Sequence, residues 1–227
     1  KKKFVDYELS ERQTLVEPED EEYRSSFEDG TIDDLPVTVV LSENGWIRSY
    51  KGHSLDTNSF KLRDGDRIKF VAELSRSQQL LIITSEGKSF SLSIDMLKKE
   101  KGFGEPLNLM IGTGNVTSIV SILPFHSEHK GLIFSRNGLG FAVSFSSLQS
   151  STKTGRQIFD LSVGDEVIGF QEITGDKVIA LSTSFKMLIF SVKELPLLKK
   201  GKGVRLQRYK EEALLDVMLF SQNEKND

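Results

Sequence analysis

The 227-residue chain contains no cysteine, only three histidines and no long apolar run. Without cysteine there is no disulfide framework, no thiolate zinc site and no cysteine nucleophile. The apolar runs fall far short of the roughly 18 residues that a membrane-spanning helix needs. The Lys1–Lys3 start leads into no apolar core of the kind found in signal peptides, so we expect neither a membrane protein nor a secreted precursor. These absences predict a cytoplasmic location.

The motifs of common catalytic sites are also missing. The sequence has no Gly-x-Ser-x-Gly elbow, no Walker A loop and no His-Glu-x-x-His helix. The stretch Gly112-Thr113-Gly114 precedes no strand–helix unit, so we interpret it as a hairpin turn rather than a nucleotide loop. His126 and His129 lie in a polar loop without matched metal ligands. We therefore expect no metal, no cofactor and no catalytic residue in this chain.

The net charge of −3 hides an uneven distribution of charge. Residues 1–34 contain twelve acidic and five basic side chains, which gives −7 and leaves +4 on the rest of the chain. The sequence predicts an acidic leader over residues 1–35, a domain over 36–220 and a polar tail over 221–227. An acidic leader on a mildly basic body favours contact with a polyanion, although a solubilising leader and an ordinary surface fit the charge equally well.

A repeat runs through the predicted domain. In each of four segments an apolar strand ends in a hydroxyl residue, a short turn follows, and a second apolar strand runs back. The hydroxyl residues lie 42, 51 and 47 residues apart, at Ser42, Thr84, Ser135 and Ser182. Two of the turns are Asn-Gly, a strong hairpin signal because both positions tolerate positive φ. The fourth turn, Ser184-Phe185, lacks the glycine, so we expect it to differ.

A second landmark recurs between these hairpins. A glycine turn precedes an alternating strand at Gly65, Gly114 and Gly164, and residues 214–220 supply the fourth strand. Every copy also has a loop in which lysine or arginine stands beside glycine, at 51–52, 101–104, 154–156 and 200–203. Only residues 93–100 and 192–199 suggest helical turns. Four strands for each repeat of roughly 45–50 residues predict an all-β fold of blades packed radially into a propeller-like disc.

Three segments of the sequence resemble a known family. Residues 38–53, which read Thr-Val-Val-Leu-Ser-Glu-Asn-Gly-Trp-Ile-Arg-Ser-Tyr-Lys-Gly-His, resemble the opening blade of the C-terminal domains of topoisomerase IV A subunits. Residues 101–107 and 195–209 resemble later parts of that domain, and the resemblance covers roughly 36–220. It implies a β-pinwheel, a disc of four-stranded blades that exchange strands, with four blades here and a possible partial blade. Residues 51–59 contain no Arg-Gly-Gly-rich box, which favours topoisomerase IV over gyrase.

The resemblance also implies a function and partners. The catalytic tyrosine of this enzyme class lies in a separate domain that nothing here resembles, so the chain by itself would be no enzyme. It would bind and bend duplex DNA and present it to an ATP-dependent type II topoisomerase core for strand passage, decatenation and relaxation. The implied partners are DNA, the remainder of the A subunit and the ATPase subunit ParE, near the nucleoid and away from membranes. Residues 4–16 resemble the linker after the catalytic core and could pair with an edge strand.

Binding to duplex phosphates requires cations spread along a track. The basic loops of successive blades would place such cations around one rim, and their glycines let the backbone approach phosphate. Without a helix for the major groove, backbone contact and bending should dominate over reading of bases. The predicted DNA-binding residues are Arg48, Lys51, Lys98, Lys99, Lys101, Lys153, Arg156, Lys199, Lys200, Lys202, Arg205 and Arg208.

Other interpretations of these features stay open. The lysines and arginines of residues 199–210 would also suit a charged edge that prevents aggregation between sheets. The acidic leader and the negative total charge favour a propeller-type protein interaction module, and a hydrolytic propeller has no motif to support it. Trp46 is expected to pack inside a blade rather than on DNA. The phenylalanines expected in the core are Phe90, Phe134, Phe141, Phe145, Phe170 and Phe190.

Overall fold

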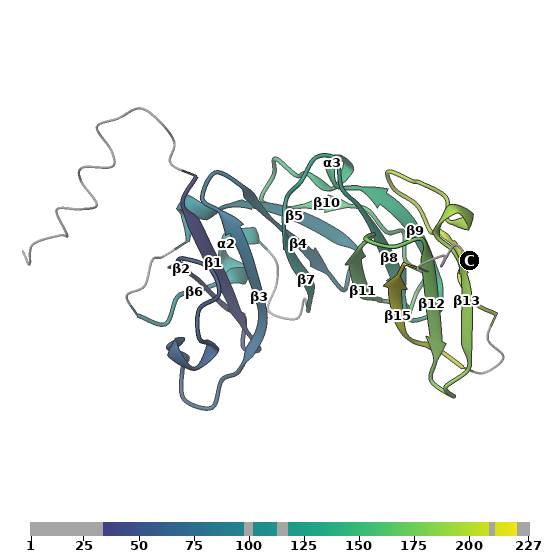
Figure 1. The fold of residues 1–227 in the computed structure, drawn as a ribbon, viewed down its shortest axis with the longest axis horizontal. Helices are drawn as coiled ribbons and strands as arrows, with labels where there is room; N and C mark the ends of the chain where they lie inside the picture. Colours follow the sequence, from purple (N-terminus) through teal and green to yellow (C-terminus); the bar gives the residue numbers. More distant parts are fainter. Residues whose placement is uncertain (1–33, 98–101, 113–117, 209–211, 222–227) are drawn as a thin grey trace, which may run out of the picture. The chain divides into compact units, whose positions relative to one another are not determined.

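A computed structural model describes residues 34–97, 102–112, 118–208 and 212–221. In these ranges the chain forms mainly short antiparallel strands in four sheets, joined by brief helical turns (Figure 1). The all-β, propeller-like fold class is thus confirmed. The predicted leader lies outside the described residues except for Asp34 and Leu35, and the predicted tail except for Ser221, so both boundaries stay predictions.

Three of the sheets have four strands. The first has the order β3-β1-β2-β6 and consists of β1 (Pro36–Ser42), β2 (Trp46–Lys51), β3 (Ile68–Ser75) and β6 (Glu105–Pro106). The second has the order β10-β5-β4-β7 and consists of β4 (Gln79–Thr84), β5 (Lys88–Ser93), β7 (Ile119–Pro124) and β10 (Arg156–Gln157). The third has the order β11-β8-β9-β14 and consists of β8 (Lys130–Ser135), β9 (Leu139–Ser144), β11 (Val167–Glu172) and β14 (Val204–Arg205).

The fourth sheet has three strands among the described residues. Its order is β13-β12-β15, from β12 (Lys177–Ser182), β13 (Met187–Ser191) and β15 (Leu214–Phe220). Short helical turns follow the hairpins, and two of them, η2 and η3, fall inside the predicted helical ranges. In the described ranges the helical elements are η1 (Thr57–Ser59), η2 (Ile94–Met96), α2 (Leu107–Ile111), α3 (Phe145–Leu148) and η3 (Val192–Glu194).

Strand exchange links the first three sheets to the next repeat. In each of them the fourth strand, β6, β10 or β14, follows the hairpin of the next sheet in the sequence. Each exchanged strand comes directly after a glycine at positive φ, and a buried aliphatic residue comes directly after the strand. The glycines are Gly104, Gly155 and Gly203, and the aliphatic residues are Leu107, Ile158 and Leu206. The exchange that the family resemblance implied is therefore confirmed.

The hairpin turns have one geometry in all four repeats. In the first, the N–H of Gly45 donates to the carbonyl of Ser42 at 3.0 Å, with φ of 81° at the glycine. In the fourth, the N–H of Phe185 donates to the carbonyl of Ser182 at 2.9 Å, with φ of 62°. The expectation that the fourth turn differs is therefore wrong. The left-handed conformation, which costs a non-glycine residue about 1–2 kcal/mol, is kept at Phe185.

The two sequence landmarks meet at the hairpin turns. The carboxylate of Asp66, next to the Gly65 turn, accepts hydrogen bonds from the backbone N–H groups of Asn44 at 3.1 Å and Arg67 at 2.8 Å. Asp165 accepts the equivalent bonds from the N–H groups of Asn137 and Glu166. Burial opposes the charged form of Asp66, but hydrogen bonds from Ser42, Arg67 and Asn44 outweigh it and lower the pKa of the carboxyl group. In the first and third sheets an aspartate thus ties the hairpin to the strand that follows it.

The described residues form three hydrophobic core clusters, each placed between consecutive sheets. The strands β3, β7, β11 and β15, one from each sheet, contact one another in series. Of the phenylalanines predicted for the core, Phe190 is partly buried and the other five are buried. None of the helices in the described ranges has the length and apolar character needed to cross a membrane. Burial between neighbouring sheets therefore accounts for the repeat seen in the sequence.

Candidate nucleic-acid interface

The exchanged strands form one edge of the first three sheets, on the side away from β3, β7, β11 and β15. We call β6, β10, β14 and the glycine loops that lead into them the outer edge; β6 and β10 are labelled in Figure 1. Because these strands occupy equivalent positions, side chains on them and on their loops recur at the spacing of the sheets. A surface of this kind can contact an extended ligand at several points.

At the second sheet, the outer edge carries Lys153 and Arg156. Both side chains are exposed, and Arg156 begins β10, where it pairs with Ser89 of β5. Gly155 lies so close to β5 that a Cβ atom on it would come within 2.5 Å of the Phe90 ring, and its φ is +72°. Glycine therefore allows the basic loop to pack directly on the sheet, which fixes where the two cations leave it.

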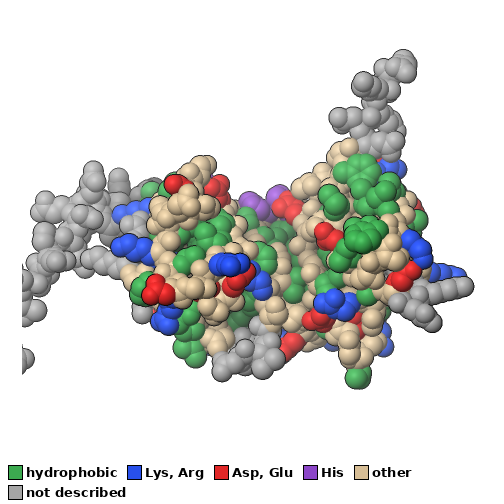
Figure 2. Space-filling view, turned by 90° about the horizontal axis from the view of Figure 1, so that it is seen from below, with side chains coloured by type: hydrophobic (Ala, Val, Ile, Leu, Met, Phe, Trp, Pro, Cys, Tyr) green, Lys and Arg blue, Asp and Glu red, His purple; other side chains and the backbone are tan. Residues whose placement is uncertain are grey.

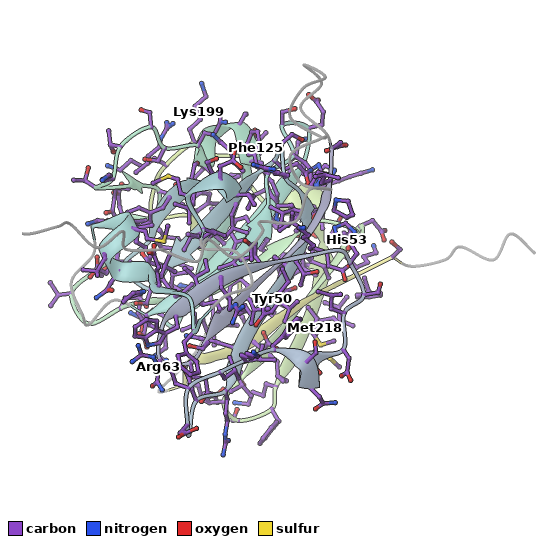
Figure 3. All side chains as sticks on the ribbon, turned by 90° about the vertical axis from the view of Figure 1, so that its left-hand side faces the viewer. Tyr50, His53, Arg63, Phe125, Lys199 and Met218 are labelled. Atoms are coloured by element: carbon purple, nitrogen blue, oxygen red, sulfur yellow. The ribbon has the colours of Figure 1, made fainter. Side chains whose placement is uncertain are left out.

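At the third sheet, the outer edge is richer in positive charge. Its exposed cations are Lys199, Lys200, Lys202, Arg205 and Arg208. Lys199 points outward from the surface in Figure 3. The Nζ atom of Lys200 lies 3.2 Å from Oδ1 of Asp160, so part of its charge is neutralised. Within the described ranges no ion pair joins Lys202, Arg205 or Arg208 to a carboxylate, so three full positive charges face solvent at this edge.

The first sheet differs from the prediction. Lys51 is exposed at the end of β2, but Arg48 is only 3% exposed. Its guanidinium donates hydrogen bonds to the backbone carbonyls of Gly102 and, at 3.4 Å, Lys61, and it lies 4.2 Å above the centre of the Tyr50 ring. The expectation that Arg48 lies on an exposed rim is therefore wrong. The two carbonyls bind the guanidinium inside the protein, and the Arg48 side chain holds the 102–104 loop against β2. The predicted Lys98, Lys99 and Lys101 lie outside the described residues.

An exposed arginine beside this loop, Arg63, was not among the predicted residues. Arg63 stacks on Trp46, with its guanidinium carbon 3.4 Å from the ring centre, and lies 5.9 Å from the ring centre of Phe103. Trp46 is half-buried under Arg63, so the packing role predicted for it is only partly correct. Phe103 is 50% exposed. Arg63 was not predicted because it lies outside the lysine–glycine loops. For Phe103 the sequence does contain a signal, since a glycine on each side of it is typical of an exposed loop tip.

The histidines form a contact of their own. The rings of His126 and His129 stack with their centres 4.5 Å apart, and Nδ1 of His129 lies 2.6 Å from Oε1 of Glu172. Among the described residues no three histidine, aspartate or glutamate side chains come together in a way that could hold a metal ion. Of the outer-edge cations, Arg205 lines a groove beside β13, and the others are exposed on loops and strand ends. The arrangement suits binding of an extended anion.

Comparisons with known proteins agree with this architecture. The profile of a family described as "DNA gyrase C-terminal domain, beta-propeller" matches residues 132–173 and 176–221. The two matched segments begin in β8 and just before β12, the first strands of the third and fourth sheets. The profile thus recognises one repeat at a time.

Similar proteins extend the match to most of the chain. The A subunit of DNA topoisomerase 4 from Rickettsia bellii is 39% identical over 189 residues, which are 83% of this chain and 26% of that protein. Its Escherichia coli counterpart is 30% identical over 190 residues, 83% of this chain and 25% of that protein. The solved structure of the E. coli ParC C-terminal domain superposes with a TM-score of 0.76 at 28% identity, covering 81% of this chain and 78% of that one. The chain spans about a quarter of the length of the curated relatives it matches.

Proposed function

The chain belongs to the family of C-terminal domains found in the A subunits of gyrase and topoisomerase IV, and from this premise we propose that it binds duplex DNA along its outer edge and bends it. The observation that carries the proposal is the set of solvent-facing cations on and just before the exchanged strands of two consecutive sheets. Arg156 lies on β10 of the second sheet. In the third sheet, Lys202 lies just before β14 and Arg205 lies on it. DNA that follows both edges contacts the protein at successive sheets.

The physical basis is neutralisation of phosphate charge. Duplex DNA carries about one negative charge for each 1.7 Å of its axis, so a binder gains most from cations placed along a line. Strands and loops at the outer edge present side chains and backbone N–H groups, and the longest helix beside them in the described residues is α2, with five residues. Binding should therefore depend weakly on base sequence, and bending should depend on how easily the duplex deforms.

In the larger protein this domain would serve a catalytic core elsewhere. We propose that it presents a bent duplex segment to the type II topoisomerase core, which carries out ATP-dependent strand passage, decatenation and relaxation. The proposed partners are the rest of the A subunit and the ATPase subunit ParE, in the cytoplasm beside the chromosome. The outer edge itself would contribute no catalytic residue and no cofactor.

A binding titration tests the proposal. The purified chain is added to two fluorescent duplexes of unrelated sequence, and anisotropy is measured at several salt concentrations. We expect similar affinities for both duplexes and a steep loss of affinity with salt, at about 0.9 units of log–log slope for each phosphate contact. Binding that ignores salt, or that is confined to one sequence, would contradict the proposal. Cleavage or relaxation by the chain alone would contradict its non-catalytic part.

A protein interaction module is the second candidate function. The observation that favours it is the apolar edge strand β13, where Met187, Leu188 and Ile189 are 61%, 41% and 50% exposed. This strand lies in the fourth sheet, whereas the cations proposed to bind DNA lie in the second and third. The two surfaces meet at Arg205, which lines the groove beside β13.

A further inference from the structure

Among the described residues, the fourth sheet has no counterpart of the strand that completes the other three. In each of the first three sheets the middle hairpin is flanked on its outer side by an exchanged strand, whereas the described residues provide no such neighbour for β13. An edge strand exposes unpaired N–H and C=O groups that can pair with another strand. The exchanged strands of the first three sheets therefore show what kind of strand can pair with the outer side of a hairpin in this fold.

The hydrogen bonds of the exchanged strands follow one pattern. The buried aliphatic residue after each strand donates its N–H to the carbonyl of the hairpin-turn glycine: Leu107 to Gly45 at 2.9 Å, Ile158 to Gly87 at 2.9 Å and Leu206 to Gly138 at 2.8 Å. The strand residue that stands two positions before this aliphatic residue pairs with the residue two positions after the turn glycine, as Val204 does with Gly140. Because hydrogen-bonded and non-hydrogen-bonded pairs alternate, Val204 and Gly140 exchange both backbone bonds.

The same acceptor groups are present in the fourth sheet. Phe185 holds the place of the turn glycine, with positive φ, and Met187 holds the place of Gly140. The carbonyl of Lys186 accepts from the N–H of Ser182, so Met187 forms the next, non-hydrogen-bonded pair with Leu181 inside the hairpin. The N–H and C=O of Met187 therefore point to the open side. Together with the carbonyl of Phe185 they repeat the binding edge of the other sheets.

The strand β13 also offers a side chain on which the glycine of such a strand can pack. In the occupied sheets that glycine packs on the third residue after the turn: a Cβ atom on Gly155 would lie 2.5 Å from the Phe90 ring, and one on Gly203 would lie 2.9 Å from Phe141. The equivalent residue in β13 is Leu188, which is 41% exposed. A groove runs beside it, lined by residues 188–190 of β13, by Glu194 and Leu195, and by residues 204–206, which include Arg205.

The face of the fourth sheet beyond this edge is apolar. Ile179, Ile189 and Met218 lie side by side in the register of β12, β13 and β15. The position of Ile179 is taken by Val39, Leu81 and Leu132 in the preceding sheets, and each of these packs in the core cluster toward the next sheet. In the fourth sheet, however, Ile189 and Met218 are 50% and 58% exposed. Figure 2 shows hydrophobic side chains gathered over this sheet, and Met218 is labelled in Figure 3.

We propose that the outer side of β13 binds an extended peptide strand in which glycine precedes a leucine or isoleucine by three residues. The strand adds antiparallel to β13, its glycine lies over Leu188, and its aliphatic residue donates its N–H to the carbonyl of Phe185. This is β-strand addition, in which main-chain hydrogen bonds provide affinity and side-chain contacts provide selectivity. The occupant is argued from three bound examples in the same chain.

A synthetic peptide copying residues 200–207, Lys-Gly-Lys-Gly-Val-Arg-Leu-Gln, is the direct probe. It is titrated into the ¹⁵N-labelled chain and backbone amide shifts are followed by NMR. The expected result is saturable shift changes concentrated at residues 185–189. A peptide with alanine at the second glycine should bind at least about tenfold more weakly, because a Cβ there clashes with β13 and disfavours positive φ.

Methylation of single peptide nitrogens provides matched controls. N-methylation at the valine removes the N–H that pairs with the carbonyl of Met187, and we expect affinity to fall at least about tenfold. N-methylation at the arginine, whose N–H points away from β13, should change affinity by no more than about twofold. In the chain, Met187→Pro removes an N–H that the hairpin does not use, so it should weaken binding while the spectrum stays folded.

Three results would overturn the proposal. The first is no shift change at residues 185–189 at millimolar peptide. The second is equal weakening by the two methylated peptides, which would exclude the predicted register. The third is a concentration-dependent dimer that protects β13 in hydrogen exchange, because a second copy of this chain would then be the occupant.

Discussion

Replacing Arg156, Lys202 and Arg205 with alanine removes three solvent-facing cations from the outer edge. Arg156 and Arg205 lie on the exchanged strands β10 and β14, and Lys202 lies in the loop before β14. All three side chains are exposed and none forms an ion pair within the described part of the chain. Each lost phosphate contact should reduce the slope of log affinity against log salt by about 0.9, so the triple variant should lose about 2.7 units.

This change is large enough to measure over a modest range of salt. Between about 50 and 200 mM salt, the parent chain should lose roughly 40-fold more affinity than the triple variant, because the concentration rises fourfold at a slope difference of about 2.7. Fluorescence anisotropy with a labelled duplex gives both slopes. The melting temperature should change little, since exposed substitutions usually cost within about 0.5 kcal/mol each.

A second triple variant separates local contact from overall charge. Replacing Lys69, Lys130 and Lys177 with alanine changes the net charge by the same amount as the outer-edge variant. These lysines lie on β3, β8 and β12, so the outer edge stays intact. We expect its slope to fall by less than about one unit. The reasoning is refuted if the two triple variants have the same slope, or if the outer-edge variant keeps the slope of the parent chain.

Three further predictions concern stability. Arg48→Ala should lower the free energy of unfolding by about 2–4 kcal/mol in chemical denaturation and leave the DNA salt slope unchanged, since its guanidinium is buried against two carbonyls; a loss of slope without destabilisation would contradict this. Gly164→Ala, at φ +80° with open space around it, should cost about 1 kcal/mol in thermal melts, and Gly155→Ala should cost at least about 1 kcal/mol more because its Cβ meets an aromatic ring; equal costs would exclude the close approach. The hydrogen bond from Lys186 holds the pKa of Glu212 at about 2 instead of 4.5, so the stability from this contact is present above about pH 4.5 and is lost as pH falls toward 2; Lys186→Met should move the NMR titration midpoint back toward 4.5, and an unmoved midpoint would exclude the pair.

The fold was largely predictable because its hairpins are encoded locally. An apolar strand, a hydroxyl residue and an Asn-Gly turn lie within a dozen residues, and positive φ at Gly45 and Gly138 explains why glycine stands there. The exchanged strands are only two residues long, too short for any alternation of apolar and polar residues to reveal them. Their presence followed from family resemblance, and their register became visible only in the structure.

The candidate site was predictable in part. Lysine and arginine beside glycine marked loops, and Lys153, Arg156, Lys202 and Arg205 are indeed exposed. Arg48 could not be placed from sequence, because the Gly102 carbonyl that it binds lies 54 residues further along the chain. Burial of a charged side chain depends on such distant acceptors rather than on its own neighbours. The same limit explains why stacking of Arg63 on Trp46 was missed.

Bending of DNA by the chain tests the central claim most directly. A duplex of about 20 base pairs, roughly 68 Å long at about 3.4 Å per base pair, is nearly straight by itself, since it is much shorter than the persistence length of about 150 base pairs. With donor and acceptor dyes at its two ends, energy transfer should rise as the chain saturates it, and should fall again when salt releases the protein. The outer-edge triple variant should show this rise only at higher protein concentration. Saturation by the parent chain with no change in energy transfer would mean that DNA is bound without following the outer edge, and the account would be wrong.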